Sequence, residues 1–196
     1  MATIIQDGTG KGFQTKVDQT NRLEVRAVVE DSQLEGAING DTFTIGTPFL
    51  TQTAATENGL LYFKSNEDVS IFAKTFSAQA RFTTGGAFNN FLIQVYENVS
   101  ESALTGTWVD FNPLNLNFGS SNELNGVFKY GSPAGATGFS GTPAFQLAFP
   151  INVYNQILTN LIFPKGIGIL LTVIPPTSNT AMPVNFSTTV TKLKNI

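Results

Sequence analysis

Residues 91–97 read Phe-Leu-Ile-Gln-Val-Tyr-Glu, and this stretch decides the fold class. Its odd-numbered positions begin with three apolar residues, whereas its even-numbered positions mix apolar and polar residues, which is the two-residue period of a β-strand. Similar short runs recur along the chain between residues 41 and 193, separated by turns rich in Gly, Pro and Asn. Eight to ten such strands predict an all-β fold, an antiparallel β-sandwich or jelly roll, because a parallel sheet would need long helical crossovers.

Three segments need separate interpretation. The apolar spacing in 154–161 predicts a short helix, and residues 33–38 are a weaker helical candidate. Residues 114–118 alternate Leu-Asn-Leu-Asn-Phe, which predicts a further strand.

The composition limits the chemistry. Only 13% of the residues are charged, and the polar residues are mainly uncharged, with 24 Thr and 18 Asn. The chain has no Cys and no His, so a Ser-His-Asp triad, a Cys nucleophile and a thiolate metal site are excluded. No cofactor or metal site is expected, because the remaining all-oxygen type of metal cage has no recognisable ligand spacing here. We therefore expect a protein that is not an enzyme.

The charge balance and the first residues also limit the partners. A net charge of −3 gives no basic patch for nucleic acid. The most apolar stretch, 157–174, is interrupted by Asn, Pro, Lys and Gly, so no membrane span is expected. The first residues lack the basic and apolar regions of a signal peptide, which predicts that the chain begins in a cytoplasm.

Charge is unevenly distributed along the chain. Residues 1–35 hold ten charged side chains, whereas residues 124–196 hold four, all of them Lys. This contrast predicts a charged N-terminal arm or hairpin over 1–35 and a β-sandwich domain over 36–196. Depletion of charge is typical of the core of an interface, so we expect residues 124–196 to contain the contact surface between subunits.

The arm has the pattern of a hairpin. A short strand over 13–17 and an alternating strand near 22–29 flank a polar turn, and a single hairpin needs a surface to lie on. We expect the arm to contact a neighbouring subunit or a capsid lattice. Its predicted interface residues are Phe13, Val17, Arg22, Leu23, Glu24, Val25 and Arg26.

Two other functions stay open. Tyr96, Trp108 and Tyr130 could form an aromatic platform for a glycan, which would make the protein a host-recognition adhesin. A glycosidase that uses only carboxylates would draw on Glu97, Glu101 and Asp110.

Several motifs resemble a diverse group of structural proteins from tailed-bacteriophage virions. A strand that ends in Val95-Tyr96-Glu97-Asn98 is followed by a Gly106-Thr107 turn and by Asn-Pro-Leu-Asn-Leu-Asn-Phe-Gly-Ser-Ser-Asn over 112–122. An apolar strand then ends in Pro-Pro-Thr-Ser-Asn-Thr over 175–180. The opening stretch over 10–26 is similar to that group as well.

The resemblance implies a β-sandwich on the outside of a phage particle that has no catalytic residues. It implies a capsid decoration or cement protein, or alternatively a neck or tail accessory protein. The expected partners are further copies of the chain, with a trimer as the expected state, and virion proteins such as the major capsid protein. The expected location is the virion, assembled in the host cytoplasm.

Overall fold

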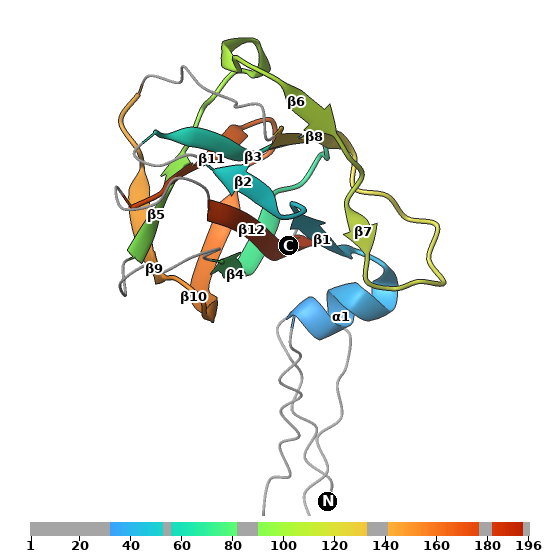
Figure 1. The fold of residues 1–196 in the computed structure, drawn as a ribbon. Helices are drawn as coiled ribbons and strands as arrows, with labels where there is room; N and C mark the ends of the chain where they lie inside the picture. Colours follow the sequence, from blue (N-terminus) through green and yellow to red (C-terminus); the bar gives the residue numbers. More distant parts are fainter. Residues whose placement is uncertain (1–31, 53–55, 82–89, 133–140, 177–181, 194–196) are drawn as a thin grey trace, which may run out of the picture. The chain divides into compact units, whose positions relative to one another are not determined.

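The computed structural model describes residues 32–52, 56–81, 90–132, 141–176 and 182–193 (Figure 1). These residues belong to the second of the two units into which the chain divides, Ser32–Ile196. The predicted arm residues, from Phe13 to Arg26, lie outside the described residues.

The described part of the chain is mostly strand, and the predicted all-β sandwich is confirmed. One α-helix and one short 3-10 turn accompany the strands. In chain order the elements are α1 (Ser32–Asn39), β1 (Thr42–Gly46), β2 (Leu50–Gln52), β3 (Asn58–Ser65), β4 (Ile71–Ala80), β5 (Asn90–Tyr96), η1 (Glu101–Ala103), β6 (Trp108–Asp110), β7 (Leu114–Asn115), β8 (Gly126–Gly131), β9 (Phe145–Pro150), β10 (Tyr154–Phe163), β11 (Gly168–Ile174) and β12 (Met182–Lys192).

The strands form two six-stranded antiparallel sheets (Figure 1). The first sheet has the order β10-β4-β12-β1-β7, with β2 also paired to β12. The second sheet has the order β6-β8-β3-β11-β5-β9. β9 and β10 are therefore edge strands of different sheets, although only a tight turn joins them in the chain.

The two sheets enclose a core of aromatic and aliphatic side chains. Because side chains alternate between the faces of a strand, each strand places every second residue inside. Phe63 on β3 meets Phe163 on β10 across the sandwich with ring centroids 5.1 Å apart, and Phe76 on β4 meets Phe145 on β9 at 6.4 Å. Burying each such ring contributes roughly 1.5–3 kcal/mol, so these contacts hold the sheets face to face.

The prediction of a helix over 154–161 is wrong, because these residues belong to the edge strand β10. The apolar residues of the segment are spaced as on a helix face, but in the strand they divide between its two sides. Ile157 and Leu161 pack against the core, whereas Tyr154, Leu158 and Ile162 are exposed. The helical spacing therefore came from a strand that has apolar residues on both faces.

The weaker helical candidate is confirmed, because α1 covers residues 33–38. The helix lies against the outer face of β1 and β12, where Gly36 packs so closely on Thr42 and Thr191 that a Cβ would clash. The hydroxyls of Thr42 and Thr191 are 3.0 Å apart beneath it.

Of the strand predicted over 114–118, only Leu114–Asn115 is strand. The rest is a loop whose side-chain amides bind the end of α1, because the last carbonyl groups of a helix lack partners within the helix. Asn117 Nδ2 donates to the Ile38 carbonyl oxygen at 2.9 Å, and Asn122 Nδ2 donates to the Asn39 carbonyl oxygen at 3.2 Å.

We expect replacement of Gly168 by Ala to destabilise the domain by about 1–3 kcal/mol, the usual cost of overpacking. An added Cβ would overlap the carbonyl oxygen of Val99, whose N–H donates to the Gly168 carbonyl oxygen at 3.0 Å. Gly119→Ala is the matched control, since the nearest atom to its Cβ would be 3.5 Å away. Urea unfolding of both variants checks this, and equal midpoints would contradict it.

Candidate functional site

The three predicted glycan-platform aromatics do not share one exposed surface. Tyr96 is buried, with 4% of its surface exposed, and its hydroxyl donates to Glu57 Oε1 at 2.7 Å. Burial and this carboxylate neighbour raise the pKa of Tyr96 to about 12. Tyr96 is therefore a neutral structural phenol at physiological pH, and its ring offers almost no area to a ligand.

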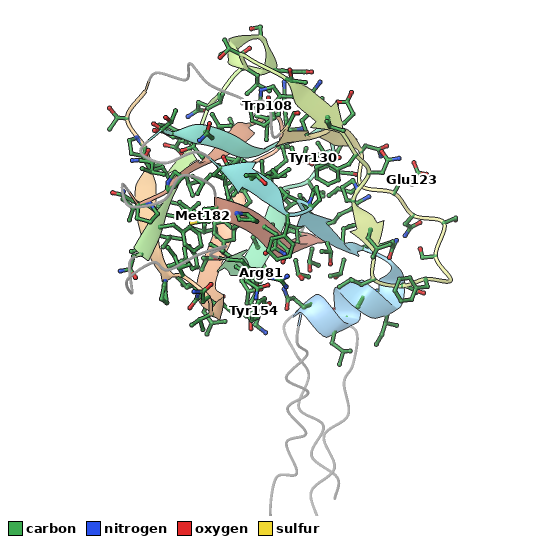
Figure 2. The ribbon with its side chains drawn as sticks, in the orientation of Figure 1. Arg81, Trp108, Glu123, Tyr130, Tyr154 and Met182 are labelled. Carbon is green, nitrogen blue, oxygen red and sulfur yellow. The ribbon has the colours of Figure 1, made fainter. Side chains whose placement is uncertain are left out.

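Trp108 and Tyr130 are both half-buried, and Figure 2 shows them on the β6 and β8 side of the sandwich. In the pairing of these strands Trp108 is opposite Gly131, and Tyr130 is opposite Val109, so the two rings point to opposite faces of the second sheet. Trp108 packs in the same cluster as Tyr96, whereas Tyr130 packs against the main core. Tyr96 and Trp108 therefore lie in one cluster, whereas Tyr130 lies in another.

The three candidate carboxylates are also divided. Glu101 and Asp110 each lie 3.0 Å from Lys129 Nζ, so one ammonium group bridges them. Hydrogen bonds to Asp110 and then Glu101 raise the pKa of Lys129, which keeps this network charged. Glu97 lies elsewhere, at the rim of a cavity. An ammonium held between two carboxyl groups is a salt-bridge network and not the acid–base pair that a glycosidase needs.

The described residues contain neither a cluster of metal-ligating carboxylates nor a helix that could span a membrane. Among them, no three Asp or Glu residues gather closely enough to hold a metal ion. None of the helices in the described ranges has the length and apolar character needed to cross a membrane.

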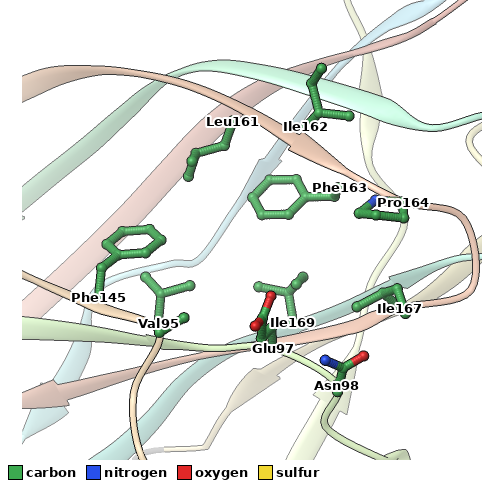
Figure 3. A pocket seen from close by; sticks show the side chains of 11 residues that line it. Val95, Glu97, Asn98, Phe145, Leu161, Ile162, Phe163, Pro164, Ile167 and Ile169 are labelled. Atoms are coloured by element: carbon green, nitrogen blue, oxygen red, sulfur yellow. The ribbon is translucent and has the colours of Figure 1, made fainter.

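A cavity of about 310 Å³ opens between the sheets on the side where β9 and β10 form the edges (Figure 3). Its wall is mainly apolar, and Glu97 and Asn98 supply the polar groups. A space of this size accommodates a side chain or a small apolar ligand. The apolar lining includes Val95, Phe145, Leu161, Phe163, Ile167 and Ile169.

The outer surface beside this cavity is also apolar. Tyr154, Leu158 and Ile162 on β10 expose 61%, 70% and 60% of their surface, and Val153 in the preceding turn exposes 52%. The sequence has no charged residue from Tyr130 to Pro164. We call the surface formed by residues 145–163 the β9–β10 seam. Apolar patches of this kind on a folded domain are typical of interaction sites.

The seam is built on a well-defined turn. Asn152 adopts the left-handed region, with φ of 62°, and its N–H donates to the Ala80 carbonyl oxygen at 2.9 Å. Asn155 Nδ2 donates to the carbonyl oxygens of Pro150 and Val153, both at 2.9 Å. These bonds fix the direction in which the chain leaves β9 and enters β10, so the edge of the first sheet is formed in advance.

The low charge of residues 124–196 predicted a contact surface in that region, but the helix predicted over 154–161 gave no indication of the exposed apolar strand β10. The uncharged stretch from residue 130 to 164 was the available signal.

No known protein family and no curated protein matches the sequence.

The carboxyl group of Glu67 stands in the turn before β4, and its side chain is only 13% exposed. Glu67 Oε1 lies 2.8 Å from Lys192 Nζ and accepts a hydrogen bond from the Asn125 N–H at 2.7 Å. Lys192 Nζ also donates to the Glu123 carbonyl oxygen at 2.7 Å. Burial opposes the ionisation of Glu67, but the hydrogen bonds from Lys192 and Asn125 outweigh it and hold the pKa of the carboxyl below its ordinary value.

We expect Glu67→Gln to lower the free energy of unfolding at pH 7 by about 1–3 kcal/mol, because it removes a charge-assisted bond. A carboxylate with a depressed folded pKa stabilises the protein above its unfolded pKa, and this stability is lost as the pH falls through the folded value. The difference between wild type and variant should therefore shrink as the pH falls below the ordinary glutamate pKa of 4.5. Chemical denaturation from pH 7 to pH 3 measures it.

Asp68→Asn is the matched control, because Asp68 is adjacent and exposed. We expect it to leave the stability at pH 7 nearly unchanged. A Glu67→Gln curve that follows the wild-type curve at every pH would show that the ion pair does not stabilise the fold.

Proposed function

We propose that the chain is a non-enzymatic structural protein of a tailed-bacteriophage virion. In this proposal it binds the outside of the capsid as a decoration or cement protein and stabilises the particle through subunit contacts. The observation that carries the proposal is the uncharged, apolar β9–β10 seam, which suits assembly better than catalysis. The sequence resemblance to virion proteins supplies the biological setting.

The chemistry of the seam supports an assembly role. Large exposed apolar side chains are costly in water, and a protein that keeps them preformed gains most when another surface covers them. In a symmetric particle one patch is used many times, so contacts of modest strength add up to firm attachment.

The resemblance motifs occupy positions where they shape the domain. Residues 95–98 end β5 at the cavity, where Asn98 takes the left-handed region with φ of 59°. Residues 112–122 contain β7 and the loop whose Asn side chains bind the end of α1. These motifs therefore serve the domain's own structure, and we propose the seam and the arm for the contacts with partners.

Two alternatives keep the same fold. A neck or tail accessory protein would use the same kinds of contact at another place in the particle, and electron microscopy of the virion at side-chain resolution separates these locations. A glycan-binding adhesin has less support, because Tyr96 is buried and Trp108 and Tyr130 point to opposite faces. Saturable binding on a glycan array that is lost in Trp108→Ala would favour the adhesin.

Deletion of residues 1–30 should leave a folded domain that no longer binds particles, because we propose that the arm attaches the domain to its neighbours. The measurement is co-sedimentation of the truncated and full-length proteins with particles depleted of this chain. A urea unfolding curve of the truncated protein verifies that the domain is intact.

A full-length variant with Leu23→Asp and Val25→Asp tests the arm without shortening the chain. It should bind particles more weakly than a control that carries Thr20→Asp and Asn21→Asp in the predicted turn. Undiminished decoration by the truncated protein would rule out the arm as the attachment.

A further inference from the structure

We propose that two copies of the chain associate through β10, which pairs antiparallel with β10 of the second copy about a two-fold axis at Gln156. The first sheets of the two copies would then form one continuous sheet. This inference rests on the proposed function only in giving self-association a biological purpose, because the contact itself is a property of the purified protein.

β10 is an edge strand that lacks the features by which proteins usually protect such edges. The strand is ten residues long, and within the described residues it pairs with β4 alone. Proteins usually protect such edges with charged side chains, Pro or very short strands, because the unpaired N–H and C=O groups are a template for another strand. The segment from Tyr154 to Phe163 contains no charged residue and no Pro.

The lack of charge on the seam favours a second copy of the chain as the partner. A charged partner would find no ion pair on the seam, since its sequence is neutral from residue 130 to 164. A second copy offers an equally neutral and equally apolar edge. The seam is therefore complementary to itself in charge and in polarity, as an isologous two-fold contact requires.

The order of the exposed residues fixes the register. Tyr154, Gln156 and Leu158 are all exposed, and their order of apolar, amide and apolar is the same in either direction. An axis at Gln156 places Tyr154 opposite Leu158 of the second copy and pairs the two Gln156 amides. Side chains that lie directly opposite each other across antiparallel strands contact one another, and an aromatic ring against an aliphatic side chain is a favourable contact of this kind.

A bulge limits the pairing to this part of the strand. β10 pairs with β4 in unbroken register from Tyr154 to Leu158, and the register shifts between Leu158 and Leu161. Asn160 lies inside this shift and takes the left-handed region with φ of 47°. The regular segment is thus centred on Gln156, where the amide-to-amide pairing also places the axis.

The ends of the paired segment lie beside the cavity. Val153 stands in the turn directly before β10 and is 52% exposed, whereas Leu161 and Phe163, beyond the bulge, line the mainly apolar cavity of about 310 Å³. In an antiparallel pair the start of one strand lies beside the end of the other, so the turn of each copy would approach the cavity side of its partner. Contact there would remove apolar surface from water.

The two-fold contact is compatible with the trimer expected from the sequence. A two-fold contact and a three-fold ring together build a closed assembly of dihedral symmetry, and each contact can be removed separately. Loss of the β10 contact should halve the mass of the assembly whatever the size of the ring.

Analytical ultracentrifugation of full-length protein tests the pairing with two charge variants. Gln156→Glu and Gln156→Lys each place like charges opposite one another across the axis, and such contacts are costly. Each variant alone should lose the contact, with a dissociation constant raised at least about tenfold. An equal mixture of the two should regain the wild-type mass, because Glu and Lys then face each other.

Leu114→Glu and Leu114→Lys are the matched controls, since Leu114 is 56% exposed on β7 at the opposite edge of the same sheet. They should keep the wild-type mass. The regained mass of the Gln156 mixture also shows that both variants fold.

Three results would overturn the inference: Gln156 variants that keep the wild-type mass, a mixture that does not regain it, or a monomeric wild type. A monomeric wild type that still binds particles would mean that the seam meets another virion protein, which leaves the proposed function intact. A dimeric wild type that never binds particles would overturn the proposed function and leave the β10 contact standing.

Discussion

The first sheet depends on one strand, β12, which pairs with β4 on one side and with both β1 and β2 on the other. Because β12 is the last strand of the chain, nearly all its contacts join residues that are far apart in sequence. Val184, Phe186 and Val190 point from it into the core, and each is fully buried. The sheet is complete only when this strand is in place, and β10 then becomes its outer edge through β4.

The same strand connects the loops at the end of the sandwich. Lys192, at the end of β12, binds Glu67 in the turn before β4 and the Glu123 carbonyl in the loop before β8. Lys192 also lies over the ring of Phe43, 5.3 Å from its centroid, so its charge is held at the border of the core. A partly buried ammonium in this position must have its partners, because an uncompensated charge at low exposure is costly.

The strands were predictable where the sequence alternates in polarity, because alternation is a local property. Residues 91–97 are an example, since the three apolar odd-numbered positions of β5 are buried. The prediction failed at β10, where Tyr154, Ile157, Leu158 and Leu161 have helical spacing. Only the pairing of β10 with β4 shows that these residues divide between two faces, and that pairing is not encoded in any local pattern.

The candidate site was predictable to a similar extent. The low charge of residues 124–196 predicted an interface in that region, because solvated surfaces usually carry charge. It could not indicate which edge of which sheet is open, since that depends on strand order. Glu67 illustrates the same limit, because its partner Lys192 is brought near only by the three-dimensional fold.

An open apolar edge strand can also cause aggregation, because an unprotected strand can pair with one further chain after another. The bulge after Leu158 limits such pairing, because it ends the regular part of β10 within a few residues. The two-fold contact that we propose would limit the pairing further, because each β10 edge would be covered by its partner and no free edge would remain there. At the other edge of the first sheet β7 has two residues and β2 has three, so they offer little template for pairing. A first sheet with one long edge and one truncated edge is suited to forming closed pairs, as the proposed role in a finite particle would require.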